Sequence, residues 1–199
     1  MPSESSSRER LLECASQLIH ARGYESVGVA ELCSAADVRK GSFYYHFDSK
    51  EDLALAMVDR IWRDRREVLF EPAFGDPTRS AEEQFAIYTA LLADGHRERF
   101  VEHGQINGCR FGNLAIELST THPDIQARIR TCLEEMAEYF ERALQGGIDS
   151  GELDPDIDVA EVAQAICAHM EGLLLLAKVR NDPEVITRLG DDAMRLAAA

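Results

Sequence analysis

The sequence of 199 residues has few of the features that mark exported or membrane-spanning proteins. Its longest apolar run, GLLLLA at 172–177, is far shorter than the roughly 20 residues that cross a bilayer. The N-terminal stretch MPSESSSRER is polar, so we expect no secretion signal. The cysteines lack paired spacing, which favours a reducing compartment, and we expect a cytoplasmic protein without a membrane partner. They are Cys14, Cys33, Cys109, Cys132 and Cys167.

The local patterns that support enzyme chemistry are also missing. There is no glycine-rich phosphate loop and no arrangement typical of a nucleophilic triad. Cys167 and His169 lie two residues apart in an expected helix, where they point to different faces, and the other histidines are scattered. We therefore expect no enzymatic activity, no cofactor and no metal ion.

Lysine is scarce, with only Lys40, Lys50 and Lys178, and 36 acidic residues outnumber 21 basic ones. The excess is uneven, because residues 1–66 hold ten basic and eleven acidic side chains, whereas residues 67–199 hold 11 and 25. Within 39–66 the basic residues lead by seven to five. The first 66 residues are thus nearly neutral with a locally basic stretch, and the rest of the chain is strongly acidic. This pattern indicates two functional parts, of which the first can bind an anion.

The chain consists almost entirely of helix-forming sequence, and strand-like alternation is absent. Ser6-x-x-Glu9 begins the first helix as a capping box, and Gly23 ends it. The prolines and the glycine of EPAFGDP (71–77) interrupt the helical pattern. Further helices are expected at about 28–36, 40–46, 49–66, 79–94, 111–120, 123–146 and 158–180, and from 183 onward. We therefore predict an all-α fold of about nine helices.

The stretch VRKGSFYYHFDSKEDL (38–53) crowds aromatic, basic and small polar residues around one short helix. Two short helices joined by a tight turn are typical of a helix-turn-helix, whose second helix enters the DNA major groove with its N-terminal residues leading. A helix N-terminus also attracts phosphate. Phe43 and Phe47 lie four residues apart and are expected to face the core. The predicted DNA contacts are Arg39, Lys40, Gly41, Ser42, Tyr44, Tyr45, His46 and Lys50.

At these residues the chain resembles the DNA-binding domain of the TetR family of one-component transcriptional regulators. The shared pattern runs through VAELCSAADVRKGSFYYHFDSKEDL (29–53), and the resemblance covers about residues 8–55. It implies a helix-turn-helix DNA-binding domain (1–48), a ligand-sensing and dimerisation domain (49–199), and a homodimer on a palindromic double-stranded DNA operator.

Three positions depart from the usual pattern of that family. Asp37 replaces a glycine of the turn, although Asp is among the few other residues that tolerate a positive φ. Gly28 replaces a capping Ser or Thr and is itself an acceptable cap. Arg39 replaces a small serine. This change is expected to alter which operator sequence the protein recognises, and it leaves the expected fold unchanged.

The expected helix at 158–180 is apolar nearly all round, because Leu174, Leu175, Leu176 and Val179 extend the apolar surface beyond its main stripe. Such a helix must be buried on several sides, and a subunit interface supplies a second side. We expect a homodimer held largely by 158–180 and 183–197. The alternative is a central core helix.

The segment GCRFGNLAIELS (108–119) resembles a subgroup of TetR regulators that includes NemR-type electrophile sensors and acrylate-responsive repressors. In NemR-type proteins a cysteine of this segment reacts and a lysine of a later helix assists, and the matching positions are Cys109 and Lys178. A neighbouring ammonium favours the reactive thiolate. The alternative is a pocket that binds an intact small molecule, lined by Phe100, Phe111, Met136 and Tyr139. The sequence leaves both modes of sensing open.

The sequence therefore predicts a ligand-responsive repressor that is released from its operator by a small-molecule or electrophile inducer. Two other classes are weaker alternatives. An enzyme has no motif in its favour. An architectural DNA-binding protein without a ligand is disfavoured, because the acidic residues 67–199 would add repulsion and no affinity for DNA.

Overall fold

The computed structural model describes residues 6–197, and every element in that range is helical, which confirms the all-α fold. The chain divides into two compact units. The first unit comprises the residues up to Arg63 together with Arg110–Arg130, and the second comprises Asp64–Cys109 and the residues from Thr131 onward. Later helices contribute buried side chains to the first unit, so this division is not the one expected for the functional domains, 1–48 and 49–199, whose boundary stays a prediction.

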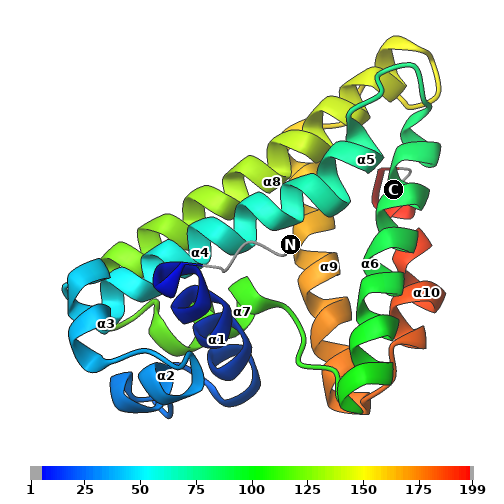
Figure 1. Cartoon of the computed structure of the whole chain (residues 1–199). Helices are drawn as coiled ribbons and strands as arrows, with labels where there is room; N and C mark the ends of the chain where they lie inside the picture. Colours follow the sequence, from blue (N-terminus) through cyan, green and yellow to red (C-terminus); the bar gives the residue numbers. More distant parts are fainter. Residues whose placement is uncertain (1–5, 198–199) are drawn as a thin grey trace. The chain divides into compact units, whose positions relative to one another are not determined.

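Three helices begin the first unit: α1 (Ser7–Arg22), α2 (Val29–Ala35) and α3 (Lys40–His46). They gather beside the start of α4 (Lys50–Arg65; Figure 1). The capping box at Ser6 and Glu9 is present, as expected. Asp37 has a φ of 50°, also as expected, and Arg10 Nε holds the turn by donating to Ala36 O at 3.0 Å. The capping box and the turn at Asp37 could therefore be predicted from neighbouring residues in the sequence.

The first unit is completed by α7 (Arg110–Leu118) and by the start of α8 (Pro123–Asp149). Phe111 of α7 is fully buried, and its ring centroid lies 6.3 Å from that of Trp62 in α4. Arg128 of α8 donates its Nε to Asp59 Oδ1 of α4 at 2.5 Å. The segment around α7 is thus part of the same packed body as α1–α3.

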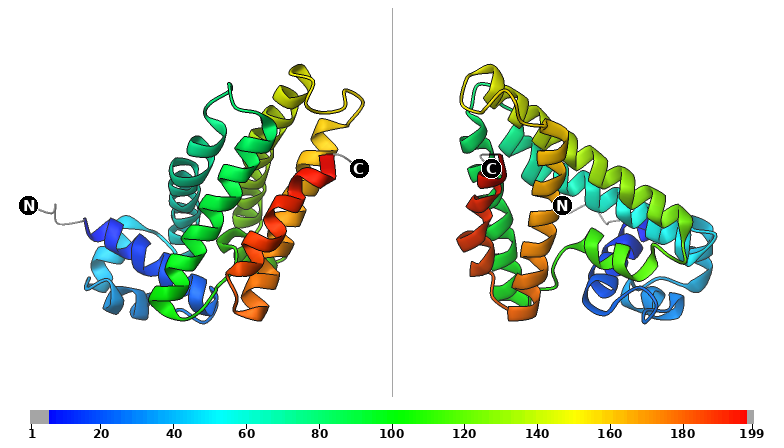
Figure 2. Two further views of the ribbon diagram at one scale, coloured as in Figure 1. Left: turned by 90° about the vertical axis from the view of Figure 1, so that its right-hand side faces the viewer. Right: turned by 180° about the vertical axis from the view of Figure 1, so that it is seen from behind.

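The second unit contains α6 (Ala81–His103), α9 (Val159–Arg180), α10 (Glu184–Gly190) and the 3₁₀-helix η2 (Asp191–Ala197), together with the rest of α8 and the segment 64–74. Figure 2 shows α6, α9 and α10 side by side. Its core contains a group of aromatic rings whose neighbouring centroids lie 5.1–6.2 Å apart, a spacing typical of favourable ring contacts. The rings belong to Phe70, Phe74, Phe85, Tyr88, Tyr139 and Phe140.

The helical pattern was expected to break at 71–77, but the break lies at 75–80. The helical path continues from α4 through the π-helix η1 (Arg66–Phe70) and α5 (Glu71–Phe74). Pro72 lies in the first turn of α5, directly after η1, where the wider π-helical pattern bonds the Glu71 N–H to Arg66 O. Similarly, α6 extends beyond the expected residue 94 to His103, and Gly104 ends it with a φ of 71°.

The helix α9 begins as expected, with Asp158 Oδ1 accepting from the Glu161 N–H at 3.0 Å. One side of α9 packs on α10 and η2, while Leu175, Leu176 and Val179 are 53%, 40% and 75% exposed. By length and composition alone α9 could cross a membrane, but a core helix of a soluble protein meets the same criterion. The expected burial of this helix on several sides is not seen within a single chain, and the homodimer stays a prediction.

Candidate nucleic-acid interface and sensor site

The short helix α3 presents aromatic and basic side chains to solvent. Phe43 and Phe47 are buried as expected, while Tyr44 is 51% and Tyr45 is 84% exposed. At the N-terminal end of α3, Lys40 is exposed, with its Nζ 5.9 Å from the centroid of the Tyr44 ring. Cations, hydroxyls and amides of this kind bind phosphates and base edges. The exposed end of α3 can therefore serve as a DNA-binding surface.

Three further predicted contacts lie on the same turn as Lys40. Arg39 is the N-terminal cap residue of α3 and is exposed, and Ser42 is partly exposed. A Cβ added to Gly41 would meet nothing within 4 Å, so no neighbour inside the unit requires a glycine there. Gly41 leaves the backbone of this turn open to close approach from outside.

The other two predicted contacts bind within the unit. His46 Nε2 lies 2.7 Å from Ser7 Oγ, which ties the end of α3 to the start of α1. Lys50 Nζ donates to Tyr24 O at 2.6 Å and lies 3.8 Å from the centroid of the Tyr24 ring. Burial lowers the pKa of Lys50, opposed by the nearby carboxylates of Glu25 and Glu117. Lys50 therefore anchors the turn between α1 and α2, a role that the sequence did not indicate.

In the second unit, the predicted sensor Cys109 is only 6% exposed and contacts an arginine. Arg65 Nη1 donates to Cys109 Sγ at 3.4 Å. Burial opposes the charge of Arg65, but the interactions with Cys109, Tyr88 and Glu171 outweigh it and raise the pKa of the guanidinium. Tyr88 is itself buried, which raises the pKa of its hydroxyl. The thiol thus lies in a polar cluster that contains a permanent positive charge.

The loop 104–109, which leads to Cys109, is attached to the C-terminal turn of α9. Asn181 accepts from the Ile106 N–H at 2.9 Å and donates to Gly104 O at 3.1 Å. Gly108 has a φ of 74°, and a Cβ added there would lie 3.1 Å from Lys178 Cδ. Only glycine suits that backbone and that close approach. The stem of Lys178 therefore flanks the residue that precedes Cys109.

Sequence analysis did not identify Arg65, although a signal for it existed. Arg65 continues the apolar stripe of Leu53, Met57 and Ile61 at a spacing of four residues. Side chains at this spacing share one face of a helix. An arginine at an inward position is unusual unless it has a polar partner.

The predicted pocket residues have separate surroundings. Phe111 belongs to the core of the first unit, against Trp62. In the second unit, Tyr139 donates its hydroxyl to Glu71 Oε1 at 2.6 Å and joins the aromatic group, whereas Met136 is buried and Phe100 is partly buried. The pocket that these four residues would line stays a prediction.

Three of the other cysteines have surroundings that suppress the thiolate. Burial raises the pKa of the Cys14 and Cys33 thiols. Burial, together with Glu171 and Glu141, raises the pKa of Cys167 to about 12. Cys132 is fully buried. Within residues 6–197, no group of three or more His, Cys, Asp or Glu side chains is placed to hold a metal ion.

A helix-turn-helix with a basic, aromatic second helix defines the class of this protein, which is a DNA-binding transcriptional regulator. Residues 11–57 match the model of bacterial regulatory proteins of the tetR family, and residues 84–191 match the tetracyclin repressor-like C-terminal domain. The chain belongs to the TetR family, as its resemblance over residues 8–55 implied.

Several relatives match over most of the chain. The transcriptional regulator AcuR of Cereibacter sphaeroides is 30% identical over 92% of this chain and 81% of its own length. The transcriptional repressor NemR of Escherichia coli is 30% identical over 88% of this chain and 86% of its own, and the structure of its reduced form has a TM-score of 0.81. A TetR regulatory protein from Rhodobacter sphaeroides has a TM-score of 0.85 at 27% identity and covers 96% of this chain and 99% of its own.

The surroundings of Cys167 lead to a prediction about its reactivity. At pH 8, Cys167 in the native protein should react with iodoacetamide roughly a thousandfold more slowly than in the denatured chain. A pKa of about 12 leaves far less of the nucleophilic thiolate than the usual value of 9.0. Mass spectrometry of timed samples measures both rates, with free cysteine as the reference. Equal rates in the native and denatured chains would contradict this account of Cys167.

Proposed function

We propose that this TetR-family protein is a repressor that binds a palindromic operator as a homodimer and is released when an electrophile modifies Cys109. The observation that carries the proposal is the hydrogen bond from Arg65 Nη1 to Cys109 Sγ at 3.4 Å. The first unit reads DNA, and the second unit receives the inducer.

The distribution of charge supports DNA binding through α3. Arg39 and Lys40 lead the helix with exposed side chains, and Tyr44 and Tyr45 follow them. Residues 67–199, by contrast, carry 25 acidic and 11 basic side chains. DNA attracts the basic end of α3 and repels this acidic part, so the charge pattern orients the protein as it approaches the operator.

The exposed face of α9 supports a homodimer. Ala165, Ala168 and Gly172 are exposed on the helix that also exposes Leu175 and Val179. Small residues permit a second helix to approach closely, and the leucine and valine supply apolar area to bury. A second copy of the chain, bound through α9, covers this face and brings two α3 helices to one palindromic site.

A partner helix also fits α9 better than a bilayer does. Glu161 and Glu171 lie within α9, and Lys178 and Arg180 lie in its last turn. Charges along a helix are costly in hydrocarbon. They are tolerated where the helix packs in water on other helices, as α9 does on α10.

The chemistry of sensing follows from the Arg65 and Cys109 pair. A guanidinium that donates to sulfur favours the thiolate, which is the nucleophilic form. The thiolate adds to the β-carbon of an α,β-unsaturated carbonyl compound and forms a carbon–sulfur bond. The π electrons of the double bond move to the carbonyl oxygen, and water supplies the proton that restores a neutral product. Arg65 provides a positive charge beside the reacting sulfur throughout.

The tight surroundings of Cys109 give the modification a mechanical effect. Cys109 is buried, and Gly108 before it packs closely on Lys178 and Leu174. Atoms added to a buried sulfur crowd its neighbours, and overpacking forces side chains and backbone to shift. The modification therefore displaces the loop 104–109 and the start of α7, which follows it directly in the chain.

The DNA-binding surface can be tested by its dependence on salt. Lys40→Ala should reduce the slope of log affinity against log salt by about 0.9, because one phosphate contact is lost. Tyr45→Ala should change the ranking of operator variants. Arg195→Ala, which removes an exposed cation of the second unit, is the charge-matched control and should leave the slope unchanged. Gel shifts on the DNA upstream of the protein's own gene measure both effects. Wild-type slopes and rankings in both variants would disprove the assignment of α3.

The dimer can be tested at the exposed face of α9. Leu175→Glu should weaken the dimer by at least about 2 kcal/mol, because the new carboxylate would lose water at the interface. Val101→Glu, at a position of α6 that is 85% exposed, is the control and should leave the dimer intact. Sedimentation at several concentrations measures the assembly. A wild-type protein that stays monomeric at micromolar concentration would refute the dimer.

The sensor can be tested with N-ethylmaleimide as the electrophile. It should release wild-type protein from DNA and modify Cys109, whereas Cys109→Ser should bind DNA and not respond. Arg65→Met keeps the approximate length of the side chain without its charge and should slow the reaction about tenfold or more at pH 7, since less thiolate forms. Lys178→Met, compared in parallel, measures the contribution of the predicted lysine. Mass spectrometry that finds Cys109 unmodified at a releasing dose would rule out covalent sensing in favour of a reversible pocket.

A further inference from the structure

The C-terminal end of α7 holds the turn between α1 and α2 through a carboxylate. Glu117 Oε2 accepts a hydrogen bond from the Tyr24 N–H, and Glu117 Oε1 accepts one from the Glu25 N–H, each at 2.8 Å. Hydrogen bonds to a charged acceptor are stronger than neutral ones, and two in parallel also fix orientation. The turn that positions α2 is therefore attached to α7.

The residues around this attachment match it closely. Gly23 has a φ of 88°, and a Cβ added there would lie 3.1 and 3.2 Å from the two Glu117 oxygens. Any other residue would strain the backbone and press on the carboxylate. Tyr24 is 4% exposed, its carbonyl accepts from Lys50 Nζ, and its ring meets His122 edge-on at 5.4 Å. The turn is thus held at several points, and a displacement of Glu117 acts on a well-ordered segment.

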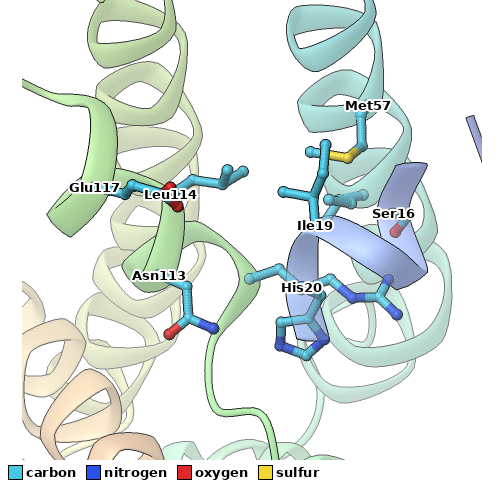
Figure 3. Close-up of a pocket in the computed structure, with 9 residues that line it drawn as sticks. Ser16, Ile19, His20, Met57, Asn113, Leu114 and Glu117 are labelled. Carbon is cyan, nitrogen blue, oxygen red and sulfur yellow. The ribbon is translucent and has the colours of Figure 1, made fainter. Parts of the chain in front are cut away.

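A pocket lies beside α7 where it faces α1 and α4. It is small and partly open to solvent, and it lies between α7 on one side and α1 and α4 on the other (Figure 3). Its walls include Ile19, His20 and Met57, opposite Asn113, Leu114 and Glu117. The side of α7 that lines this pocket is therefore not in full contact with α1 and α4.

The chain connects this attachment directly to the sensor. Arg110, the first residue of α7, follows Cys109, and Glu117 lies eight residues beyond Cys109, or about 12 Å along a helix. A displacement of Cys109 therefore moves one end of a helix whose other end holds the turn. We infer that Glu117 transmits the signal from Cys109 to the DNA-binding helices by repositioning the turn at Tyr24 and Glu25. This inference rests on the proposed function and names the residue that couples its two parts.

The test compares wild type with Glu117→Ala and Glu117→Gln. Asp124→Asn is the matched control, because it also removes one negative charge from an exposed position of the first unit. The response to the inducer is measured as a ratio: the dissociation constant of the operator complex with N-ethylmaleimide, divided by the constant without it. We expect Cys109 to be modified equally in all four proteins, while the ratio falls about fivefold or more in both Glu117 variants and is unchanged in the control.

A purely structural role of Glu117 predicts a different result. It would weaken operator binding equally with and without N-ethylmaleimide and leave the ratio at the wild-type value, which would overturn the inference. Circular dichroism reports folding, and Glu117→Gln, which retains one acceptor oxygen, decides the question if Glu117→Ala is unfolded.

A second measurement separates this inference from the proposed function. If wild type is not modified at Cys109, or is modified without release, the proposed function fails. Coupling between two sites is reciprocal, so it can then be measured without an inducer. Operator DNA should change the hydrogen exchange of the amides at 104–109 in wild type and leave it unchanged in Glu117→Gln. The absence of a change in wild type, or the same change in both proteins, would overturn the inference.

Discussion

The burial of Phe43 and Phe47 fixes the surface that the first unit offers to DNA. The two rings, one in α3 and one at the residue that ends it, have a centroid separation of 5.8 Å. Because each residue of an α-helix is rotated by about 100° from the previous one, Tyr44 and Tyr45 must then point away from the core. Arg8 of α1 lies over the Phe47 ring at 5.4 Å, and His46 bonds to Ser7. The orientation of the exposed tyrosines therefore depends on how α3 packs on α1.

That dependence makes the turn between α1 and α2 a sensitive point. The turn is held by contacts from α4 and α7 and not by its own sequence alone. Within the first unit, Lys50 and Glu117 approach the backbone around Tyr24 with opposite charges, one bonding to a carbonyl and the other to amides. Opposite charges close together stabilise each other, and their removal from water limits where each can move. The turn is thus held jointly by α4 and α7.

In the second unit, the helix α9 has two roles on different sides. Its C-terminal turn holds the loop 104–109 through Asn181 and packs on Gly108 through Lys178. Its exposed face carries the apolar residues assigned to the dimer. The proposed sensor and the proposed interface are therefore attached to one rigid element. The arginine beside Cys109 keeps its charge at every physiological pH, unlike a lysine whose pKa falls on burial, so it is a dependable source of positive charge for a thiolate.

The sequence by itself determined the elements that depend on neighbours in the chain. The cap at Ser6 located a helix start, the spacing of Phe43 and Phe47 identified buried positions, and Asp37 was expected at a positive φ. The same local rules failed at Pro72, because a proline in the first turn of a helix does not end it. Only the tertiary structure decided the contacts that connect the sites. Arg65 and Cys109 are 44 residues apart, and Glu117 and Tyr24 are 93 apart. Local periodicity shows which face of a helix is buried, but partners at such separations are set by how the helices pack together.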